Sequence, residues 1–314
     1  MLIRTLAVAG AVALMLGGGT AQAADPEACK TVRFSDVGWT DITATTAAAS
    51  EVLKGLGYEA KVEVLSVPVT YTSLKNKDID VFLGNWMPSM AADIEPYSKD
   101  GSVESLRPNL EGAKYTLAVP KYVAEGGVKD FADIAKHKDK LDNKIYGIEP
   151  GNDGNRLVQS MIDKDAFGLK GFELVESSEQ GMLSQVARAA KTKEWIVFLG
   201  WEPHPMNANF DMAYLTGGDD YFGPNFGGAT VFTNVRKGYA AECPNVGKLL
   251  QNLEFTLQME NEIMGLILDQ GMDPNKAAAQ WLKEHPAVID PWLAGVTTID
   301  GKDGLAAVKG HLGV

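Results

Sequence analysis

A short apolar run that ends in glycine, tryptophan and proline occurs twice in this chain. The copies are residues 79–88 (IDVFLGNWMP) and residues 197–203 (VFLGWEP). In each copy, β-branched and aromatic residues predict a short buried strand, glycine is expected to turn the backbone sharply, and proline is expected to end the strand. Trp86 and Trp201 would then stand at strand ends, where open α/β sheets bind ligands. A single tryptophan in such a place is more often core, but this repeated pair predicts facing walls of one cleft.

The first 23 residues have the features of a cleaved secretion signal. One charged residue, Arg4, precedes an apolar run from Leu6 to Leu16, and Ala21-Gln22-Ala23 provides a small-residue cleavage site. No later apolar stretch is long enough to span a bilayer, and no cysteine stands at the cleavage point to carry a lipid anchor. We therefore expect a mature protein that begins at residue 24 and diffuses freely in the periplasm.

Charge and cysteine content narrow the choice of partners and compartment. Without Arg4, the 29 basic residues become 28 against 41 acidic ones, which leaves a net charge of −13. The absence of a basic run argues against nucleic acid and favours a cationic solute. Cys29 and Cys243 are the only cysteines, and in an oxidising compartment such a pair predicts a disulfide that contributes about 4–5 kcal/mol. That bond would place both ends of the mature chain in one lobe.

The order of strands and helices predicts two α/β lobes, which agrees with a mature length of about 290 residues. In the first part, strands at 31–35, 60–64 and 79–83 alternate with a helix between Thr40 and Gly57 and a helix at 71–77. In the middle part, strands at 114–120, 144–149, 172–175 and 197–201 alternate with helices at 131–141, 156–164 and 181–190. The remaining chain contains a strand at 229–235 and one long amphipathic helix at 246–268. We place lobe I at 24–112 and 212–314 and lobe II at 113–211, with hinges near Ala113 and Asp211.

Several polar and aromatic residues fall at the predicted strand ends. Trp39 and Asp41 lie between a strand and a helix, and Asn152 lies in a glycine-rich corner that leads into a helix. Thr40 or Asp41 can also be a plain helix cap, and Asn152 a plain turn residue. Together the candidate ligand-binding residues are Trp39, Asp41, Trp86, Tyr115, Asn152 and Trp201.

This residue set suits a quaternary ammonium ion. Aromatic faces carry negative potential, so several rings can enclose a cation that has no N–H donors, at about 0.5–2 kcal/mol for each contact. The hydroxyl of choline would find an acceptor in Asp41 and a donor or acceptor in Asn152. The carboxylate of glycine betaine would be repelled by Asp41, so the chemistry favours choline.

These residues also carry a resemblance to a known family. Trp39-x-Asp41, Gly84-Asn85-Trp86, Tyr115, Gly151-Asn152-Asp153 and Gly200-Trp201-Glu202 resemble the periplasmic glycine betaine/choline substrate-binding proteins of ABC importers, over essentially the whole mature chain and including the cysteine pair. The likeness is greatest to the choline-binding branch. It implies the type II periplasmic binding protein fold, with two α/β lobes, two crossover hinges and the ligand in the cleft between the lobes.

The resemblance also implies roles for residues and partners. Trp39 and Trp86 from one lobe, with Tyr115 and Trp201 from the other, would form an aromatic box for choline. Asp41 and Asn152 would hold the choline hydroxyl. A monomeric receptor of this kind delivers its ligand to the permease and ATPase subunits of an ABC transporter, and it needs no cofactor, metal or catalytic residue.

Two alternatives remain open at this point. A receptor for acetylcholine, glycine betaine or a polyamine would use a related cleft, although polyamines need more carboxylates for their N–H groups. An enzyme acting on choline esters would need catalytic groups, and the four histidines (His137, His204, His285, His311) show no metal-binding spacing. His204 near Glu202 is the only acid/base pair expected beside the cleft. We interpret Trp195, Trp281 and Trp292 as packing residues.

Overall fold

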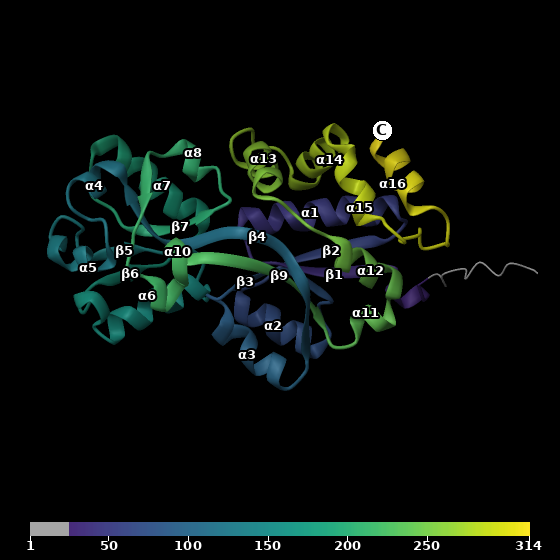
Figure 1. Ribbon diagram of the computed structural model, residues 1–314, viewed down its shortest axis with the longest axis horizontal. Coiled ribbons are helices and arrows are strands. Elements are labelled where there is room, and N and C mark those ends of the chain that lie inside the picture. Colours follow the sequence, from purple (N-terminus) through teal and green to yellow (C-terminus); the bar gives the residue numbers. More distant parts are fainter. Residues whose placement is uncertain (1–24) are drawn as a thin grey trace, which may run out of the picture.

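One sheet of nine strands runs through the part of the chain that the structure describes. The computed structural model describes residues 25–314, so the predicted signal segment, residues 1–23, lies outside the described residues. The strand order is β2-β1-β3-β9-β4-β7-β5-β6, and β8 pairs with β4 (Figure 1). The strands are β1 Thr31–Asp36, β2 Glu59–Val64, β3 Val81–Met87, β4 Val103–Pro120, β5 Lys144–Tyr146, β6 Glu173–Val175, β7 Phe198–Glu202, β8 Met212–Tyr214 and β9 Gly228–Arg236.

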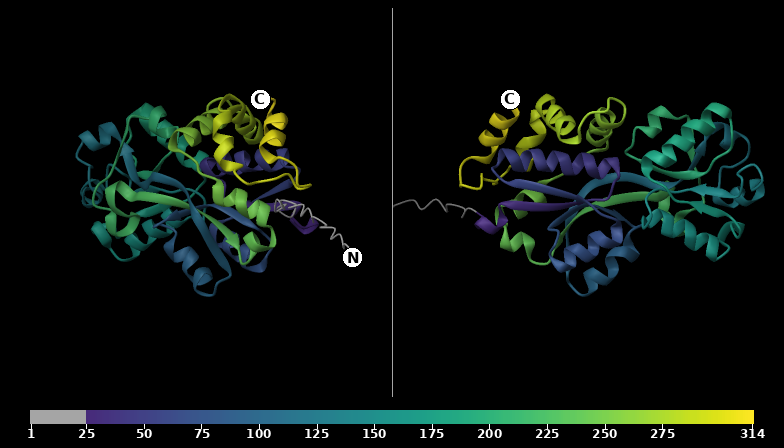
Figure 2. Two further views of the ribbon diagram at one scale, coloured as in Figure 1. Left: turned by 45° about the vertical axis from the view of Figure 1, so that its right-hand side comes forward. Right: turned by 180° about the vertical axis from the view of Figure 1, so that it is seen from behind.

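Helices cover both faces of this sheet and divide the molecule into two lobes. The first lobe is built on the parallel strands β1, β2 and β3, and the second on β5, β6 and β7. Both views in Figure 2 show the helices as layers above and below the sheet. The first lobe carries α1 Thr40–Gly55, α2 Val67–Asn76, α3 Ala91–Lys99, α11 Tyr239–Glu242, α12 Pro244–Asn252, α13 Leu257–Leu268, α14 Pro274–Glu284, α15 Ile289–Trp292 and α16 Gly304–Leu312. The second carries α4 Lys121–Glu125, α5 Phe131–Ile134, α6 Asp153–Asp163, α7 Glu179–Thr192 and α8 Met206–Asn209, and the short helices α9 Asp219–Phe222 and α10 Pro224–Gly227 lead back toward the first. The predicted α/β class and its two lobes are confirmed.

Two long antiparallel strands, β4 and β9, connect the lobes (Figure 1). Their register runs from Val103 opposite Arg236 to Lys114 opposite Gly228, with bulges that shift the pairing on the way. β8 pairs antiparallel with β4, at Ala118–Pro120. β8 therefore lies beside the second-lobe end of β4, and β9 runs antiparallel to β4.

The glycines of the two tryptophan motifs serve packing rather than turning. Gly84 and Gly200 lie inside β3 and β7, so the sharp turn expected at each glycine is wrong. A Cβ atom on Gly84 would come 2.7 Å from the side chain of Ile42, and one on Gly200 would come 2.9 Å from Ala118. The chain turns after the tryptophans instead, at the cis peptides that precede Pro88 and Pro203.

The long helix predicted at 246–268 is wrong because the chain breaks after α12. Leu253 is extended, and the Thr256 hydroxyl accepts the Met259 backbone N–H to begin α13. Asn252 donates to the backbone carbonyls of Trp292 and Ala294, which fixes the end of α12. Contacts from a distant segment therefore end a helix that the local apolar pattern would continue.

A disulfide joins two distant segments of the chain at the outer end of the first lobe. Cys29 and Cys243 form a disulfide across a sequence separation of 214 residues, as predicted. Trp281 and Trp292 are buried, which agrees with their interpretation as packing residues. No helix in the part of the chain from residue 25 onward is long and apolar enough to cross a membrane.

Candidate functional site

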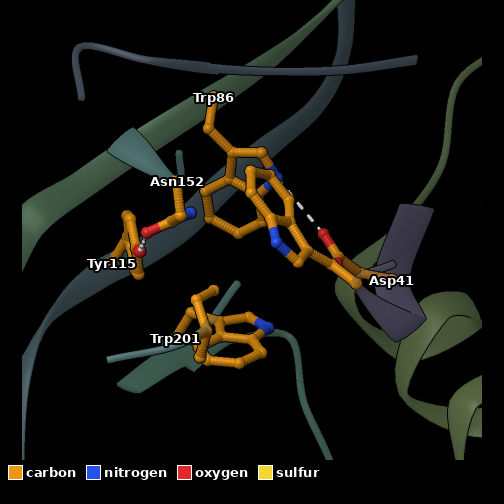
Figure 3. Close-up of a pocket in the computed structure, with 7 residues that line it drawn as sticks. Asp41, Trp86, Tyr115, Asn152 and Trp201 are labelled. Atoms are coloured by element: carbon orange, nitrogen blue, oxygen red, sulfur yellow. Dashed lines mark hydrogen bonds between the residues drawn. The ribbon is translucent and has the colours of Figure 1, made fainter. Parts of the chain in front are cut away.

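The six candidate residues meet in one pocket between the lobes. The pocket is lined by Trp39, Asp41, Trp86, Tyr115, Ile148, Asn152 and Trp201. Each of these side chains belongs to a residue that is at most 5% exposed. Figure 3 shows Asp41 and Trp86 of the first lobe facing Tyr115, Asn152 and Trp201 of the second. The two lobes are therefore in contact around an enclosed space with largely aromatic walls.

The rings stand at steep angles to one another. The Trp86 and Tyr115 rings are 6.0 Å apart at 63°, and the Tyr115 and Trp201 rings are 6.2 Å apart at 85°. Tyr115 is the register partner of Trp201 in the β4–β7 ladder, and Phe222 packs edge-on behind it at 5.7 Å. Because side chains of paired residues share one face of a sheet, the strand pairing itself brings two of the walls together. Such a set of ring faces attracts a diffuse positive charge.

Asp41 supplies a buried carboxylate at the wall of the pocket. It is the second residue of α1, whose N-cap is Trp39, so the alternative in which Asp41 caps this helix is wrong. Its Oδ2 accepts the indole N–H of Trp86 at 3.2 Å, and its Oδ1 accepts no hydrogen bond from any described residue. Burial raises the pKa of Asp41 well above its usual value, the nearby charge of Glu179 raises this pKa further, and the Trp86 bond opposes both effects. The carboxylate is thus prepared for a positive or hydrogen-bonding partner.

Asn152 joins the second strand end to the aromatic wall. It is the N-cap of α6, where its Oδ1 accepts the backbone N–H of Asn155 at 3.0 Å and the Tyr115 hydroxyl at 2.8 Å. Its amide nitrogen donates to Asp153 at 3.0 Å. A primary amide has two N–H donors, so one remains for a ligand. The same side chain therefore caps a helix, orients Tyr115 and presents a donor.

Ile148 lines the pocket but was missed by the sequence analysis. It follows β5 and is 2% exposed. Together with its neighbours Ile145 and Gly147, it has the sequence pattern of an ordinary buried strand. An apolar residue at a strand end has no chemical feature that separates a ligand contact from core packing.

Polar contacts between the lobes flank the pocket. Arg156 of α6 donates to the Asp93 carboxylate at 2.6 Å and to the Ser89 carbonyl at 3.0 Å, both in the first lobe. On another side, Glu179 of α7 accepts two hydrogen bonds from Thr40 of α1. These contacts join the two lobes beside the pocket.

His204 and Glu202, the acid/base pair of the enzyme alternative, do not pair with each other. His204 contacts Glu179 at 3.1 Å, whereas Glu202 pairs with Lys114 at 2.7 Å. His204, Glu179 and Glu202 do not line the pocket. Among the residues that the structure describes, no group of three His, Cys, Asp or Glu side chains has the arrangement of a metal site.

Solved structures of related proteins resemble most of this chain closely. One is described as an ABC-transporter choline binding protein in complex with choline; it is 73% identical, covers 92% of this chain and all of that chain, and superposes with a TM-score of 0.91. The same kind of protein in an unliganded semi-closed conformation gives a TM-score of 0.84 at the same identity and coverage. The fold is therefore the type II periplasmic binding protein fold, with its ligand cleft between two lobes, as predicted.

Sequence comparison identifies the family. The glycine betaine/carnitine transport binding protein GbuC of Listeria monocytogenes is 30% identical over 165 residues, which are 52% of this chain and 54% of that protein. The family described as the substrate binding domain of ABC-type glycine betaine transport system matches residues 30–284. Its members are binding components and not enzymes. This chain belongs to that family of substrate-binding domains of ABC-type glycine betaine transport systems.

Proposed function

We propose that this protein binds choline in the pocket between its lobes and delivers it to an ABC importer. The observation that carries the proposal is an enclosed aromatic pocket that contains a buried carboxylate oxygen with no partner among the described residues. The related choline binding protein in complex with choline supports the same ligand, because 73% identity extends over 92% of this chain.

The aromatic walls account for recognition of the trimethylammonium group. Rings from both lobes surround the space, so the cation can contact several faces without a hydrogen-bond donor. Each contact contributes about 0.5–2 kcal/mol when water is excluded. We assign Trp39, Trp86, Tyr115 and Trp201 to this box. Micromolar affinity corresponds to about 8 kcal/mol of binding free energy. Because association itself costs free energy, the ring contacts reach this value only together with the charge of Asp41.

The polar side chains account for recognition of the hydroxyl. In this proposal Asp41 Oδ1 accepts the hydroxyl proton, and the second amide N–H of Asn152 donates to the hydroxyl oxygen. The lack of a partner for Asp41 Oδ1 among the described residues and the single hydrogen bond of the Asn152 amide nitrogen support this assignment. Glycine betaine carries a carboxylate in place of this hydroxyl. That carboxylate would meet Asp41 in a buried site, where repulsion between like charges is strong. We therefore assign choline, rather than the betaine of the family's description, as the preferred ligand.

The proposal includes a place and a partner for the protein. A substrate-binding component of this family works outside the cytoplasm, and the predicted signal at residues 1–23 would direct the chain to the periplasm. The partners would be the permease and ATPase subunits of the importer, which distinguish the closed lobes from the open ones. We further propose that the receptor is a monomer.

The positions of the hinges are part of the same proposal. We place the second lobe at 113–227 and the first at 24–112 and 228–314. The pairing of β8 with β4 supports the later second boundary, which the sequence analysis had put at 211. Closure would then bend β4 and β9 where they cross between the lobes, near Ala113 and Ala229.

Calorimetric titration of choline, acetylcholine, glycine betaine and tetramethylammonium tests the proposal. We expect choline to bind most tightly, tetramethylammonium to bind more weakly because it lacks the hydroxyl, and glycine betaine to bind weakest. Tighter binding of glycine betaine than of choline would overturn the assignment of the ligand. Conversion of any choline ester during the titration would overturn the role as a receptor.

A further inference from the structure

We propose that Glu179 is a positioning residue that fastens the second lobe to the turn carrying Trp39 and Asp41, and so slows the release of ligand. The inference rests on the proposed function, because it concerns closure of the same pocket. Glu179 begins α7 and does not line the pocket. It acts on the ligand only through the residues that it holds.

The amino end of α1 has no cap within its own segment. Trp39 is the N-cap and makes no side-chain capping bond, so the first backbone N–H groups of the helix need other acceptors. Glu179 Oε2 accepts the Thr40 backbone N–H at 2.8 Å, and Glu179 Oε1 accepts the Thr40 hydroxyl at 2.5 Å. A residue of the second lobe thus caps a helix of the first across a sequence separation of 139 residues. A carboxylate at this end also interacts favourably with the helix dipole.

The second lobe holds this carboxylate in one orientation. The Met206 backbone N–H donates to His204 Nδ1 at 2.9 Å, so Nδ1 is an acceptor and the ring proton is on Nε2. Nε2 lies 3.1 Å from Glu179 Oε1 and therefore donates to it. The Glu179 backbone N–H in turn donates to Glu149 Oε1 at 3.0 Å. The carboxylate is fixed by its own lobe before it meets Thr40.

The contact links closure to the shape of the pocket. Thr40 lies directly between Trp39 and Asp41, so an acceptor fixed to its backbone N–H fixes both neighbours. Glu179 is fully buried at 0% exposure, and α1 and α7 belong to different lobes in Figure 1. Opening the lobes breaks both Thr40 bonds at once. Because buried bonds to a charged group are costly to break, the contact should act mainly on the rate of opening.

The contact between Arg156 and Asp93 has a different character. Its guanidinium side chain is 39% exposed, so solvent screens it and reduces its contribution. It also lies away from the α1 turn, on α3 and α6. Of these two inter-lobe contacts, the one between Glu179 and Thr40 is buried and lies next to pocket residues.

Stopped-flow binding of choline to matched variants tests the proposal. We expect Glu179→Gln and Thr40→Val each to raise the dissociation rate constant at least about tenfold and to change the association rate constant by less than about threefold. Thr40→Val removes the hydroxyl bond but keeps the backbone N–H bond and the charge of Glu179, so it separates the hydroxyl contact from any field effect on Asp41. Thr40→Ser keeps the hydroxyl and should restore the slow dissociation. Combining the two substitutions should add little to either alone.

Thr46→Val is the matched control on the same helix. Thr46 is 1% exposed, and its hydroxyl makes no hydrogen bond with any described residue. This control should leave both rate constants unchanged. Dissociation from Glu179→Gln and Thr40→Val at the wild-type rate would overturn the proposal, as would equal effects of Thr40→Val and Thr46→Val.

Hydrogen exchange keeps this test separate from the identity of the ligand. With the lobes closed by whichever compound of the titration series binds, the Thr40 amide should exchange at least about tenfold faster in Glu179→Gln than in the wild type. Failure of the wild type to bind choline would reject the proposed function, and the exchange rates would still decide the role of Glu179. Unchanged exchange at Thr40 in a folded Glu179→Gln variant would reject that role even if choline binds.

Discussion

Trp86 and Trp201 occupy equivalent places in two strands, and each presents its indole to the same pocket. Both residues are only 3% exposed, so each ring is packed over almost its whole surface in this arrangement of the lobes. Loss of either ring removes a wall and admits water to the cation. The effect on binding should therefore exceed the energy of a single ring contact.

We predict that Trp86→Ala or Trp201→Ala weakens choline binding at least about tenfold, which corresponds to about 1.4 kcal/mol. Calorimetry gives the affinity, and far-ultraviolet circular dichroism shows whether the fold persists. Trp195→Phe is the control, because Trp195 is half-buried outside the pocket and packs against Lys140. Unchanged affinity in both pocket variants would count against the aromatic box.

The carboxylate of Asp41 should make choline binding depend on pH. Burial and the charge of Glu179 hold its pKa well above the usual value, so in the ligand-free protein it takes up a proton as the pH falls. Choline favours the charged form, so affinity should fall as the pH decreases through the raised pKa. Binding should release a proton in that range.

Calorimetric titrations across this pH range, in buffers of different ionisation enthalpy, measure both effects. Asp41→Asn should bind choline more weakly and lose most of the pH dependence. Asp153, whose pKa burial raises to about 6, touches Asn152 and accounts for any dependence that remains. A pH profile that is the same in the wild type and in Asp41→Asn would contradict the assignment.

The sequence identified six of the seven residues that line the pocket because each has a chemical signature at a strand or helix end. Ile148 has none and could not be distinguished from core. Asp41 does not cap α1, because the first backbone N–H of this helix is bonded by a residue of another segment. Glu179 satisfies the Thr40 N–H from the other lobe, and no local pattern indicates a partner so far away in the sequence.

At the scale of elements, the start of α6 is packed directly against the aromatic wall. A Cβ atom on Gly154 would come 2.0 Å from the Tyr115 hydroxyl oxygen and 3.0 Å from Asn152 Oδ1. The helix can therefore approach β4 only because this position has no side chain. The spacing between the two elements sets the place of the Tyr115 ring.

We predict that Gly154→Ala weakens choline binding at least about tenfold, although alanine favours a helix by about 1 kcal/mol over glycine. The added methyl group displaces the phenol ring and breaks its bond to Asn152. Gly310→Ala in α16 is the matched control, because its Cβ would meet nothing within 4 Å. Equal affinities of the two variants, measured by calorimetry, would show that the packing does not set the pocket.

The disulfide should matter for stability and not for recognition. It ties the segment before β1 to the start of α12, at the outer end of the first lobe and away from the pocket (Figure 1). Replacing Cys29 and Cys243 with serine should lower the free energy of unfolding by about 2–5 kcal/mol. Urea denaturation measures this loss, and choline affinity should change by less than about threefold. A large loss of affinity in the folded variant would contradict this separation.

Elements were predicted best where their signals are local. The strands before Trp86 and Trp201 and the alternation of strands with helices follow from short apolar runs, and these were confirmed. The single helix at 246–268 was wrong because contacts with Trp292 and Ala294 end α12. The turn predicted at Gly84 was wrong because glycine is needed there for packing: a Cβ atom would clash with Ile42, which lies on α1.

At the scale of the whole molecule, the structure describes the closed arrangement of the lobes. The pocket residues are almost fully buried, and the TM-score is higher against the choline complex than against the unliganded semi-closed form. Closure brings rings, carboxylate and amide from two lobes to one place. The continuous strands β4 and β9 keep the lobes joined while they move.

The central claim is that this pocket selects a permanent positive charge. The most direct measurement compares choline with its neutral carbon analogue, in which a carbon atom replaces the nitrogen and the shape is unchanged. Calorimetric titration should give an affinity for the analogue that is at least about a hundredfold lower, or about 2.7 kcal/mol. Equal affinity for the two compounds would contradict the account, because the pocket would then recognise shape and apolar surface alone.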